Sequence, residues 1–423
     1  MSVTDGATGA DEDAGLLLAA TQAFVGTRSE GAAPLPVVVA VSGGGDSMAL
    51  LHLMHRAAPL AGYAVQAVTV DHGLRPEAAA EAAGVACFCA TLGIPHATLR
   101  WGGRESTGNL MDQARRARLR LIGNWAVSQA IGHVVLGHTA DDQAESFLMN
   151  LSRAAGLDGL SGMRAEWQSD GTVWSRPLLA HSRASLRAYL RRQGVAWVDD
   201  PSNDNDRFAR VKARRALKAL GPLGITVQRL NMTIANLAAA QGAVLHATAK
   251  AAEGIEERAG ALRVPVQLLL TQPAEIQRRL LIGMVRWMNG ADYPPREAKV
   301  SQLQQALHAG RDATLGGVRF RHRDECLVIM RESRAAGPAA SLGAIWDHRW
   351  RVTGPGQAQV RALGADGLAQ TKDWRAAGIE RDVAVVTPGV WVGDQLVAAP
   401  LLGFGDHFTA TLTAAFGLFL ISH

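Results

Sequence analysis

The segment 37–50 constrains the fold of this chain more than any other. An apolar, β-branched run at 37–41 ends in Ser42-Gly43-Gly44-Gly45-Asp46-Ser47, and a helical pattern follows. This order predicts a buried strand, a glycine turn and the N-terminus of a helix. Backbone N–H groups and the positive end of the helix dipole then meet at one point, where a phosphate or pyrophosphate can bind.

The residues of this turn indicate which class of phosphate-binding loop it forms. The three glycines can adopt positive φ and let an anion approach the backbone closely. Ser42 and Ser47 can add hydroxyl donors, and Asp46 can hold a divalent cation that shields phosphate charge. The turn has neither the lysine of a Walker A loop nor a spaced G-x-G-x-x-G. An ordinary glycine-rich turn is the alternative, but six specified positions in this local context favour the phosphate site.

Size and composition indicate a globular protein of several domains. The 423 residues allow two or three domains, and a hydrophobic content of 48% is too high for a disordered chain. No apolar run approaches the roughly 18–20 residues that a membrane helix needs. The N-terminus is acidic and polar and does not resemble a secretory signal. We therefore expect a cytoplasmic protein with no membrane partner.

The three cysteines do not indicate a disulfide framework, because they are few and odd in number. Cys87 and Cys89 lie two positions apart in a helical stretch, where such residues do not face each other. The sequence offers no further ligands that would complete a zinc or iron–sulfur site around them. We expect these residues and Cys326 to be buried packing cysteines.

Positive charge is concentrated between residues 176 and 218. This segment has eleven Lys and Arg against four Asp, an excess larger than the net charge of +5 of the whole chain. Arginine dominates, which favours planar, bidentate contacts to phosphate. A solvated helix face is the alternative, but the pattern predicts contact with a nucleic acid or a nucleotide.

Apolar runs alternate with helical patterns from residue 35 onward. The expected strands are 35–41, 64–70, 95–100, 133–137 and 172–176. The expected helices are 46–58, 76–92, 109–130, 140–153 and 181–193. This alternation predicts an α/β fold with a doubly wound parallel sheet that helices cover on both faces. Ligands bind such sheets at the carboxyl ends of the strands. Three polar segments are expected there: 42–47, 71–75 and 137–138.

Changes in composition suggest four regions. A short helical extension is expected at 1–30 and the α/β sheet at 31–218. The turn-rich sequence DDPSNDND at 199–206 marks a break near the end of the sheet region. Residues 219–311 are predicted to be helical. Residues 312–423 have short β-like runs separated by glycine and proline, and are predicted to form a small α+β domain.

The segment 137–145, GHTADDQAE, carries a second site signal at the end of a predicted strand. Asp141 and Glu145 are four positions apart on the following helix, and Asp142 and Glu145 are three apart, so these carboxylates lie close together. They can bind Mg²⁺ or grip an ammonium group. Stabilisation of the helix dipole is the alternative, but it does not require three acids beside His138. A zinc site is not expected, because no second histidine lies one turn from His138.

Other basic residues could also contact a nucleotide or RNA. Arg115 and Arg118 share one face of the predicted helix at 109–130. His72 and Arg75 follow the second predicted strand. A solvated helix face and a polar strand exit are the respective alternatives.

These motifs, in this order, resemble those of the tRNA(Ile)-lysidine synthetases, which are N-type ATP pyrophosphatases with a pyrophosphate (PP) loop. The likeness covers residues 35 to about 216. It rests on SGGGDS (42–47), DHGLR (71–75), AR-x-x-R with Ala114, Arg115 and Arg118, GHTADDQAE (137–145), GLDGLSGM (156–163), RPLL (176–179), and DPSN (200–203) followed by Arg210 and Arg214. Single elements occur across PP-loop enzymes, whereas the full ordered set is specific.

The resemblance implies a catalytic ATP pyrophosphatase domain of the adenine nucleotide alpha hydrolase type at 31–218 and a helical tRNA-binding domain at 219–311. It also implies a two-step reaction. ATP adenylates the C2 carbonyl oxygen of the wobble cytidine in a tRNA(Ile) with a CAU anticodon. The ε-amine of free L-lysine then attacks C2 and expels AMP, which leaves lysidine. The implied cofactors are ATP and Mg²⁺.

The resemblance further implies roles for individual residues. The residues that would bind ATP are Ser42, Gly43, Gly44, Gly45, Asp46, Ser47 and His138. Asp46 would also hold Mg²⁺ and would be a catalytic residue. Arg115 would be catalytic too, because it would stabilise phosphate charge. The remaining catalytic residues, Asp141, Asp142 and Glu145, would bind the lysine ammonium. The tRNA would be contacted by Arg118, Arg210 and Arg214.

The sequence departs from the family pattern at three places. Leu119 stands where a tyrosine often follows AR-x-x-R, and Val211 stands where an asparagine often follows the first arginine after DPSN. Arg153-Ala154-Ala155-Gly156 replaces the usual R-G-x-G. These changes concern local contacts and leave the PP loop and the acidic cluster intact.

Two other functions and one question of assembly stay open at this point. A tRNA 2-thiolase shares the PP loop but uses paired cysteines in C-x-x-C or cluster-binding form, which Cys87-x-Cys89 does not supply. A tRNA-binding chaperone with a vestigial nucleotide fold would not require the acidic residues of both motifs. A homodimer is compatible with the sequence.

Overall fold

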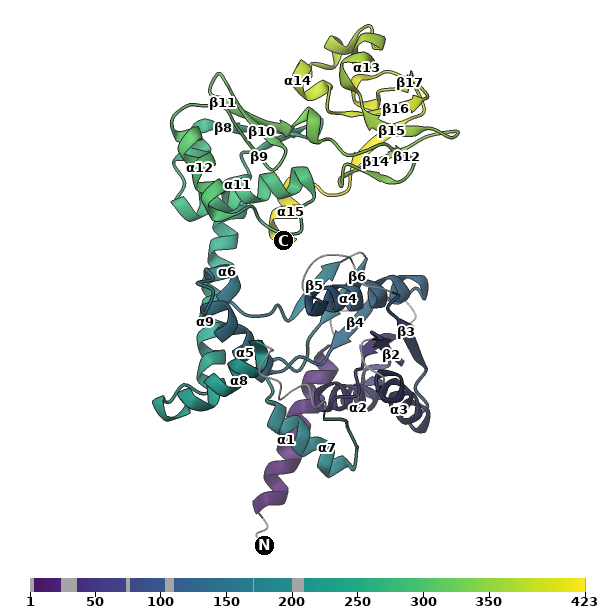
Figure 1. Cartoon of the computed structure of the whole chain (residues 1–423), viewed down its shortest axis with the longest axis vertical. Coiled ribbons are helices and arrows are strands. Elements are labelled where there is room, and N and C mark those ends of the chain that lie inside the picture. The colour runs from purple at the N-terminus through teal and green to yellow at the C-terminus, as the bar shows by residue number, and fades with distance from the viewer. Residues whose placement is uncertain are drawn as a thin grey trace. The chain divides into compact units, whose positions relative to one another are not determined.

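The chain folds into two compact units. The computed structural model describes residues 4–23, 36–73, 77–102, 110–169, 171–199 and 209–422. The first unit comprises residues 1–241 and the second comprises residues 242–423. Figure 1 labels their helices and strands.

A six-stranded sheet with the order β3-β2-β1-β4-β6-β5 forms the centre of the first unit. β1 pairs in parallel with β2 and β4, β2 with β3, and β4 with β6, whereas β5 is antiparallel to β6. The strands are β1 (Val37–Ala40), β2 (Val65–Asp71), β3 (His96–Arg100), β4 (His133–Leu136), β5 (Glu166–Ser169) and β6 (Thr172–Ser175). The doubly wound sheet is thus confirmed, and each predicted strand is present within two residues of its expected ends. The antiparallel edge strand β5 was not predicted.

Helices cover both faces of this sheet, which explains why β1 is apolar along its length. Val37 and Val39 lie in one core with Leu50 of α2 and Tyr189 of α7. Val38 points to the opposite face, because side chains alternate along a strand, and packs near α4. The helices of this unit are α1 (Thr4–Gln22), α2 (Gly45–Ala61), α3 (Ala78–Thr91), α4 (Leu110–Ser128), α5 (Ala140–Leu151), α6 (Leu157–Leu160), α7 (Arg183–Gln193) and α8 (Ala209–Leu220).

The strand order reverses at β1. β2 and β3 lie on one side of it, and β4 and β6 on the other. In a doubly wound sheet the ligand site lies beyond the carboxyl ends of the strands at this point. The chain leaves β1 toward α2 and leaves β4 toward α5. The two strongest sequence motifs therefore meet at the same edge of the sheet.

The second unit begins within α9 (Val227–Ala252), a helix that starts in the first unit. Its five-stranded sheet has the order β7-β8-β11-β10-β9, and α11 and α12 pack on it in one core. The elements are β7 (Glu256–Arg258), β8 (Ala261–Pro265), α10 (Val266–Leu270), α11 (Ala274–Asn289), α12 (Glu297–His308), β9 (Ala313–Leu315), β10 (Val318–Arg323) and β11 (Cys326–Arg331).

This sheet crosses the expected boundary between residues 311 and 312. β8 lies before that boundary and pairs with β11, which lies after it. We expected helices with few strand signals at 219–311, so β7 and β8 are additions to that expectation. Both are short and lie among segments rich in Ala, Leu and Gln, and the local composition therefore concealed them.

Short strands and helices complete the second unit. Two further sheets have the orders β12-β15-β16-β17 and β13-β14-β18. Trp346, Trp350 and Val390 share a core that joins these sheets. The strands are β12 (Ala340–Ser341), β13 (Ile345–Trp346), β14 (Trp350–Thr353), β15 (Gln359–Ala362), β16 (Pro388–Val392), β17 (Gln395–Ala398) and β18 (Thr409–Leu412), and the α-helices are α13 (Gly364–Gln370), α14 (Arg381–Ala384) and α15 (Phe416–Ser422).

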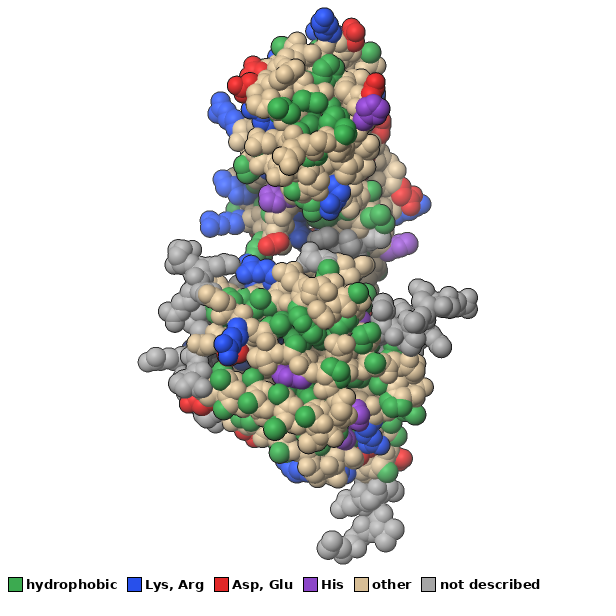
Figure 2. Space-filling model, turned by 90° about the vertical axis from the view of Figure 1, so that its right-hand side faces the viewer, with side chains coloured by type: hydrophobic (Ala, Val, Ile, Leu, Met, Phe, Trp, Pro, Cys, Tyr) green, Lys and Arg blue, Asp and Glu red, His purple; other side chains and the backbone are tan. Residues whose placement is uncertain are grey.

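Within the described part of the chain, every helix is too short or too polar to span a membrane. On the face drawn in Figure 2, hydrophobic side chains lie interspersed among polar ones.

Candidate active site

The turn after β1 has the geometry of an anion site. α2 begins at Gly45, with Gly44 as its N-cap, and no side chain caps this end of the helix. The Ser42 N–H donates to Ser47 Oγ at 3.1 Å, and Ser47 Oγ donates to the Gly44 carbonyl at 2.9 Å. Gly43 has φ of +84°, a conformation that favours glycine. The serines therefore hold the turn in shape, while the N-terminus of α2 lacks a side-chain cap and can receive an anion.

Two neighbouring segments pack closely on this turn. A Cβ at Gly137 would lie 3.1 Å from the Asp46 carbonyl oxygen, so only glycine lets the end of β4 approach α2 without a shift. On another side, the Val198 N–H donates to the Gly43 carbonyl at 3.0 Å. The Trp197 ring lies against Gly45. The turn is thus held by residues whose role the sequence did not indicate.

The acids of α5 serve two purposes. Thr139 caps the helix, and Asp142 completes a capping box in which its Oδ2 accepts the Thr139 N–H at 2.9 Å. This oxygen therefore caps the start of the helix. The other oxygen, Oδ1, lies 3.3 Å from Arg183 Nη2 and 3.6 Å from Arg210 Nη1. One carboxylate thus both starts the helix and takes part in an ionic cluster.

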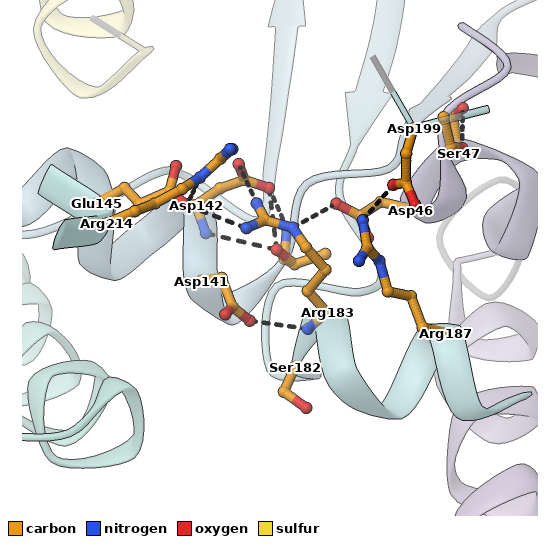
Figure 3. Close-up of polar contacts among 12 residues, drawn as sticks. Asp46, Ser47, Asp141, Asp142, Glu145, Ser182, Arg183, Arg187, Asp199 and Arg214 are labelled. Atoms are coloured by element: carbon orange, nitrogen blue, oxygen red, sulfur yellow. Dashed lines mark hydrogen bonds and ion pairs between the residues drawn. The ribbon is translucent and has the colours of Figure 1, made fainter. Parts of the chain in front are cut away.

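Arg183, at the start of α7, connects the two motifs (Figure 3). Its Nε lies 3.1 Å from Asp46 Oδ2, and its Nη1 lies 3.1 Å from Glu145 Oε1. Its backbone N–H donates to Asp141 Oδ2 at 2.7 Å. The structure therefore brings together Asp46 and all three acids predicted in the 137–145 segment, and it does so around an arginine that sequence reasoning missed.

Two of the arginines predicted to contact RNA also face the acids. Arg214 Nε lies 2.7 Å from Glu145 Oε1, and Arg210 Nη1 lies near Asp142 as described above. The segment 200–203 that carries DPSN, and the residues Leu74 and Arg75 of DHGLR, lie outside the described residues.

The charges in this cluster shift the pKa values of its members. Burial raises the pKa of Asp46 above its ordinary value, although Arg183 opposes this. Burial also acts to raise the pKa of Asp142, but Arg183 and Arg210 outweigh it and lower that pKa. Burial acts to lower the pKa of Arg183, but its three carboxylate neighbours outweigh it and raise that pKa. The ionic contacts at Arg183 and Asp142 therefore favour their charged forms.

His138 is held as a neutral hydrogen-bond donor. Burial, together with Arg176, lowers the pKa of His138 to about 3, so the ring is uncharged at neutral pH. Arg176 Nε donates to His138 Nδ1 at 3.1 Å, which places the ring proton on Nε2. Arg176 in turn stacks over Trp167, with Cζ 4.0 Å from the ring centroid. His138 can donate to an anion, but it is not tuned for proton transfer near pH 7.

Arginines on α4 contribute to a second, positive part of the site. Burial and repulsion from Arg115 and Arg210 lower the pKa of Arg118 to about 10. Burial and repulsion from Arg115 and Arg118 likewise lower the pKa of Arg176 to about 10. Like charges held this close favour an anionic ligand between them.

A cavity of about 260 Å³ adjoins these arginines. It is lined by Arg115, Ser146, Phe147, Met149, Asn150, Arg153, Gly159, Gly162, Met163 and Arg210. These residues include members of the GLDGLSGM segment, which has no ionisable group besides Asp158. The motif therefore contributes shape and apolar walls beside three charged guanidinium groups, those of Arg115, Arg153 and Arg210.

Comparison with known proteins identifies the family. A PP-loop domain family matches residues 22–220. A tRNA(Ile)-lysidine synthase of Ruegeria pomeroyi is 44% identical over 92% of this chain and 95% of its own length. The chain belongs to the tRNA(Ile)-lysidine synthase family. A second lysidine synthase, from Rhizobium meliloti, is 35% identical over 83% of this chain and 80% of its own length. Among solved structures, a U34-tRNA thiolase from Methanococcus maripaludis is 14% identical over 52% of this chain and 76% of its own, with a TM-score of 0.43.

In this member of the lysidine synthase family, the residues after β2 and the cysteines lie in local packing contacts or at the surface. Asp71 Oδ1 accepts the Gly73 N–H at 2.9 Å, so it shapes its own turn. His72 packs edge-on against Trp101, and burial lowers its pKa. Cys89 is buried as expected, whereas the expectation was wrong for Cys87, which is exposed, and Cys326 is only partly buried. Within the described residues, no group of three or more His, Cys, Asp or Glu side chains is placed to bind a metal ion.

Proposed function

We propose that this chain joins L-lysine to C2 of the wobble cytidine in a tRNA(Ile) with a CAU anticodon, and that it uses ATP and releases AMP and pyrophosphate. Membership of the tRNA(Ile)-lysidine synthase family supports this reaction. The observation that carries the assignment of residues is the contact of one guanidinium, that of Arg183, with both Asp46 and Glu145. The phosphate turn and the acidic cluster thus lie within the span of one side chain, as a reaction between an activated base and an amine requires.

ATP would bind with its phosphates at the N-terminus of α2. Backbone N–H groups of the turn and the exposed hydroxyl of Ser42 are suited to phosphate oxygens. His138 Nε2–H and Arg115 would add donors from the adjoining strand end and helix. The cytidine C2 oxygen attacks the α-phosphorus, and pyrophosphate leaves. Positive groups already in place stabilise the charge that develops in this step.

The residues fit a magnesium ion at Asp46. Its Oδ1 is buried and has no hydrogen-bond partner among the described residues. A carboxylate oxygen is a ligand that Mg²⁺ prefers. When bound, the ion would supply positive charge to the ATP phosphates.

Lysine would bind with its ε-ammonium at Asp142 and Glu145, beside Asp141. Glu145 Oε2 is buried and has no hydrogen-bond partner among the described residues, so it can accept from an ammonium N–H. The ammonium gives one proton to this group of carboxylates and becomes a neutral amine. The amine attacks C2, the C2–O bond breaks, and AMP leaves.

The tRNA would contact the arginines that border the acids. Arg210 and Arg214 lie one turn apart on α8, and Arg118 lies on α4. An extruded cytidine suits this arrangement, because single-stranded loops are where proteins read RNA bases. We further propose that the helices within 219–311 bind another part of the tRNA.

One experiment tests the reaction. The protein is incubated with tRNA(Ile) bearing CAU, ATP, Mg²⁺ and labelled lysine. We expect labelled tRNA together with AMP and pyrophosphate in equal amounts. A chain that transfers sulfur to this tRNA, and never lysine, would instead be a thiolase.

The substitution Asp46→Ala tests the proposed ATP site. It removes the carboxylate from the first turn of α2, and we expect adenylation to fall by at least about 100-fold. The tRNA affinity, measured by filter binding, should stay within a few-fold because the RNA contacts are made elsewhere. Normal adenylation by this variant would remove Asp46 from the mechanism.

A further inference from the structure

Arg183 occupies the centre of the acidic cluster. Its guanidinium contacts Asp46, Asp142 and Glu145 with three different nitrogens, at 3.1, 3.3 and 3.1 Å. Asp142 and Glu145 are the carboxylates assigned above to the lysine ammonium. The arginine and a substrate ammonium would therefore need the same oxygens.

The side-chain ion pairs of Asp46, Asp142 and Glu145 balance one another in charge. Three carboxylates, from Asp46, Asp142 and Glu145, face three guanidinium groups, from Arg183, Arg210 and Arg214. An ammonium at Asp142 or Glu145 would have to share carboxylate oxygens that guanidinium groups already hold, which is unfavourable in a partly buried site. A cation can bind well only if one of the arginines withdraws.

The contacts of Arg183 make it the arginine whose movement matters, because they reach both the acids and the phosphate turn. The Glu145 side chain is only 1% exposed, and Arg183 and Arg214 cover its Oε1. Its Oε2 is buried and has no hydrogen-bond partner among the described residues. Arg183 is 19% exposed and also contacts Asp46, the residue of the phosphate turn. Movement of Arg183 would expose the Glu145 carboxylate and would also remove the contact with Asp46 at the ATP site.

We propose that Arg183 is a tethered placeholder cation, which occupies the lysine-ammonium site until nucleotide binding at the phosphate turn draws it away. This inference rests on the proposed function. The guanidinium is rigid and planar, so loss of its contact to Asp46 reorients the nitrogens that hold Asp142 and Glu145. Phosphate oxygens at the turn offer the displaced guanidinium another anionic partner. Lysine would then bind after ATP, so an amine could not occupy the site before the nucleotide that activates the base has bound.

Calorimetric titration of L-lysine tests this coupling. The wild-type protein is titrated alone and with Mg²⁺ and α,β-methylene-ATP, which resists cleavage between the α and β phosphates. We expect the nucleotide to raise lysine affinity roughly tenfold, as when about one molecule in ten is open without it. In Arg183→Met, lysine should bind without nucleotide as tightly as it binds to the wild-type protein with nucleotide, and the coupling should vanish.

Two further variants separate this role from a structural one. Arg192→Met removes an arginine of the same helix that pairs with Glu12 and Asp13, away from the acidic cluster, and should keep the full coupling. Arg183→Lys keeps the charge but cannot bridge three carboxylates, and should reduce the coupling even if Arg183→Met does not fold. Circular dichroism melting of each variant reports folding separately.

The outcomes distinguish the two proposals. If nucleotide does not change lysine affinity in the wild-type protein, or if folded Arg183→Met binds lysine more weakly without nucleotide, Arg183 is not a placeholder, while lysine ligation to tRNA can still be observed. If the wild-type protein neither binds lysine nor labels tRNA(Ile), the proposed function fails, and the placeholder role fails with it.

Discussion

Arg183 and Asp46 lie 137 positions apart in the chain, yet their side chains meet. No helical or strand periodicity links two such positions, so the sequence predicted the acids and not the cation among them. The positive segment at 176–218 was predicted to contact a nucleic acid or a nucleotide. Three of its members, Arg183, Arg210 and Arg214, also contact carboxylates of the site. At this scale, residue types were predictable, and their partners were not.

A buried histidine outside the site predicts how stability depends on pH. His133 hydrogen-bonds with Ser175 through Nε2 at 2.8 Å, and burial lowers its pKa to about 4. The unfolded chain therefore takes up a proton as the pH falls below about 6.5, while the folded chain does not, so stability decreases between pH 6.5 and 4. From this histidine alone we expect a loss of about 2 kcal/mol in the free energy of unfolding by pH 5.

The substitution His133→Gln should reduce this pH dependence. Urea unfolding at pH 7.5 and pH 5 would show a smaller decline for the variant than for the wild-type protein, even if the variant is less stable at both values. His246→Gln, at an exposed position of α9, serves as the control and should leave the decline unchanged. An identical decline in all three proteins would contradict the assignment to His133.

At the scale of elements, the junction between β4 and α5 has to pack against the start of α2. A Cβ added at Gly137 would lie 3.1 Å from both the Asp46 carbonyl oxygen and Ser47 Cα. Those atoms are backbone and cannot rotate away, so Gly137→Ala should displace the phosphate turn at a cost of about 1–3 kcal/mol. We expect ATP affinity, measured by calorimetry, to fall at least about tenfold.

Gly132→Ala is the matched control, because it lies at the other end of β4 and its Cβ would meet nothing within 4 Å. It should bind ATP like the wild-type protein. Equal ATP affinity for the Gly137 and Gly132 variants would show that the turn tolerates the shift.

Elements were predictable where one local signal dominated. The β1, β2 and β4 runs are apolar because both faces of the sheet are covered, and the glycine turn and capping residues mark where α2 and α5 begin. β5 and β7 are short and largely exposed, so neither apolar runs nor alternation marked them. The phosphate turn and the acids of the site were predictable for the same reason as their elements. The contacts that Trp197 and Val198 make with the phosphate turn were not predictable, because they depend on the path of the chain after α7.

At the scale of the whole molecule, the residues assigned to ATP and lysine all lie in the first unit. Binding of Mg²⁺ and α,β-methylene-ATP should therefore slow amide hydrogen exchange in segments of that unit, since a ligand stabilises the structure that binds it. We expect protection at 42–47 and 137–145 and unchanged exchange in β8, β10 and β11. Protection of comparable size in the five-stranded sheet of the second unit would show that nucleotide binding is coupled to both units.

The location of the site within residues 1–241 also bears on how the protein is made. A ribosome adds about 5–20 residues per second, and domains generally fold as units from the N-terminus. The complete set of site residues would thus emerge roughly 10 to 40 seconds before the last residue of the chain. During that interval the nascent first unit already contains the acidic cluster, and Arg183, Arg210 and Arg214 balance the charges of Asp46, Asp142 and Glu145. The first unit thus brings its own positive charges to these carboxylates before any substrate or ion binds.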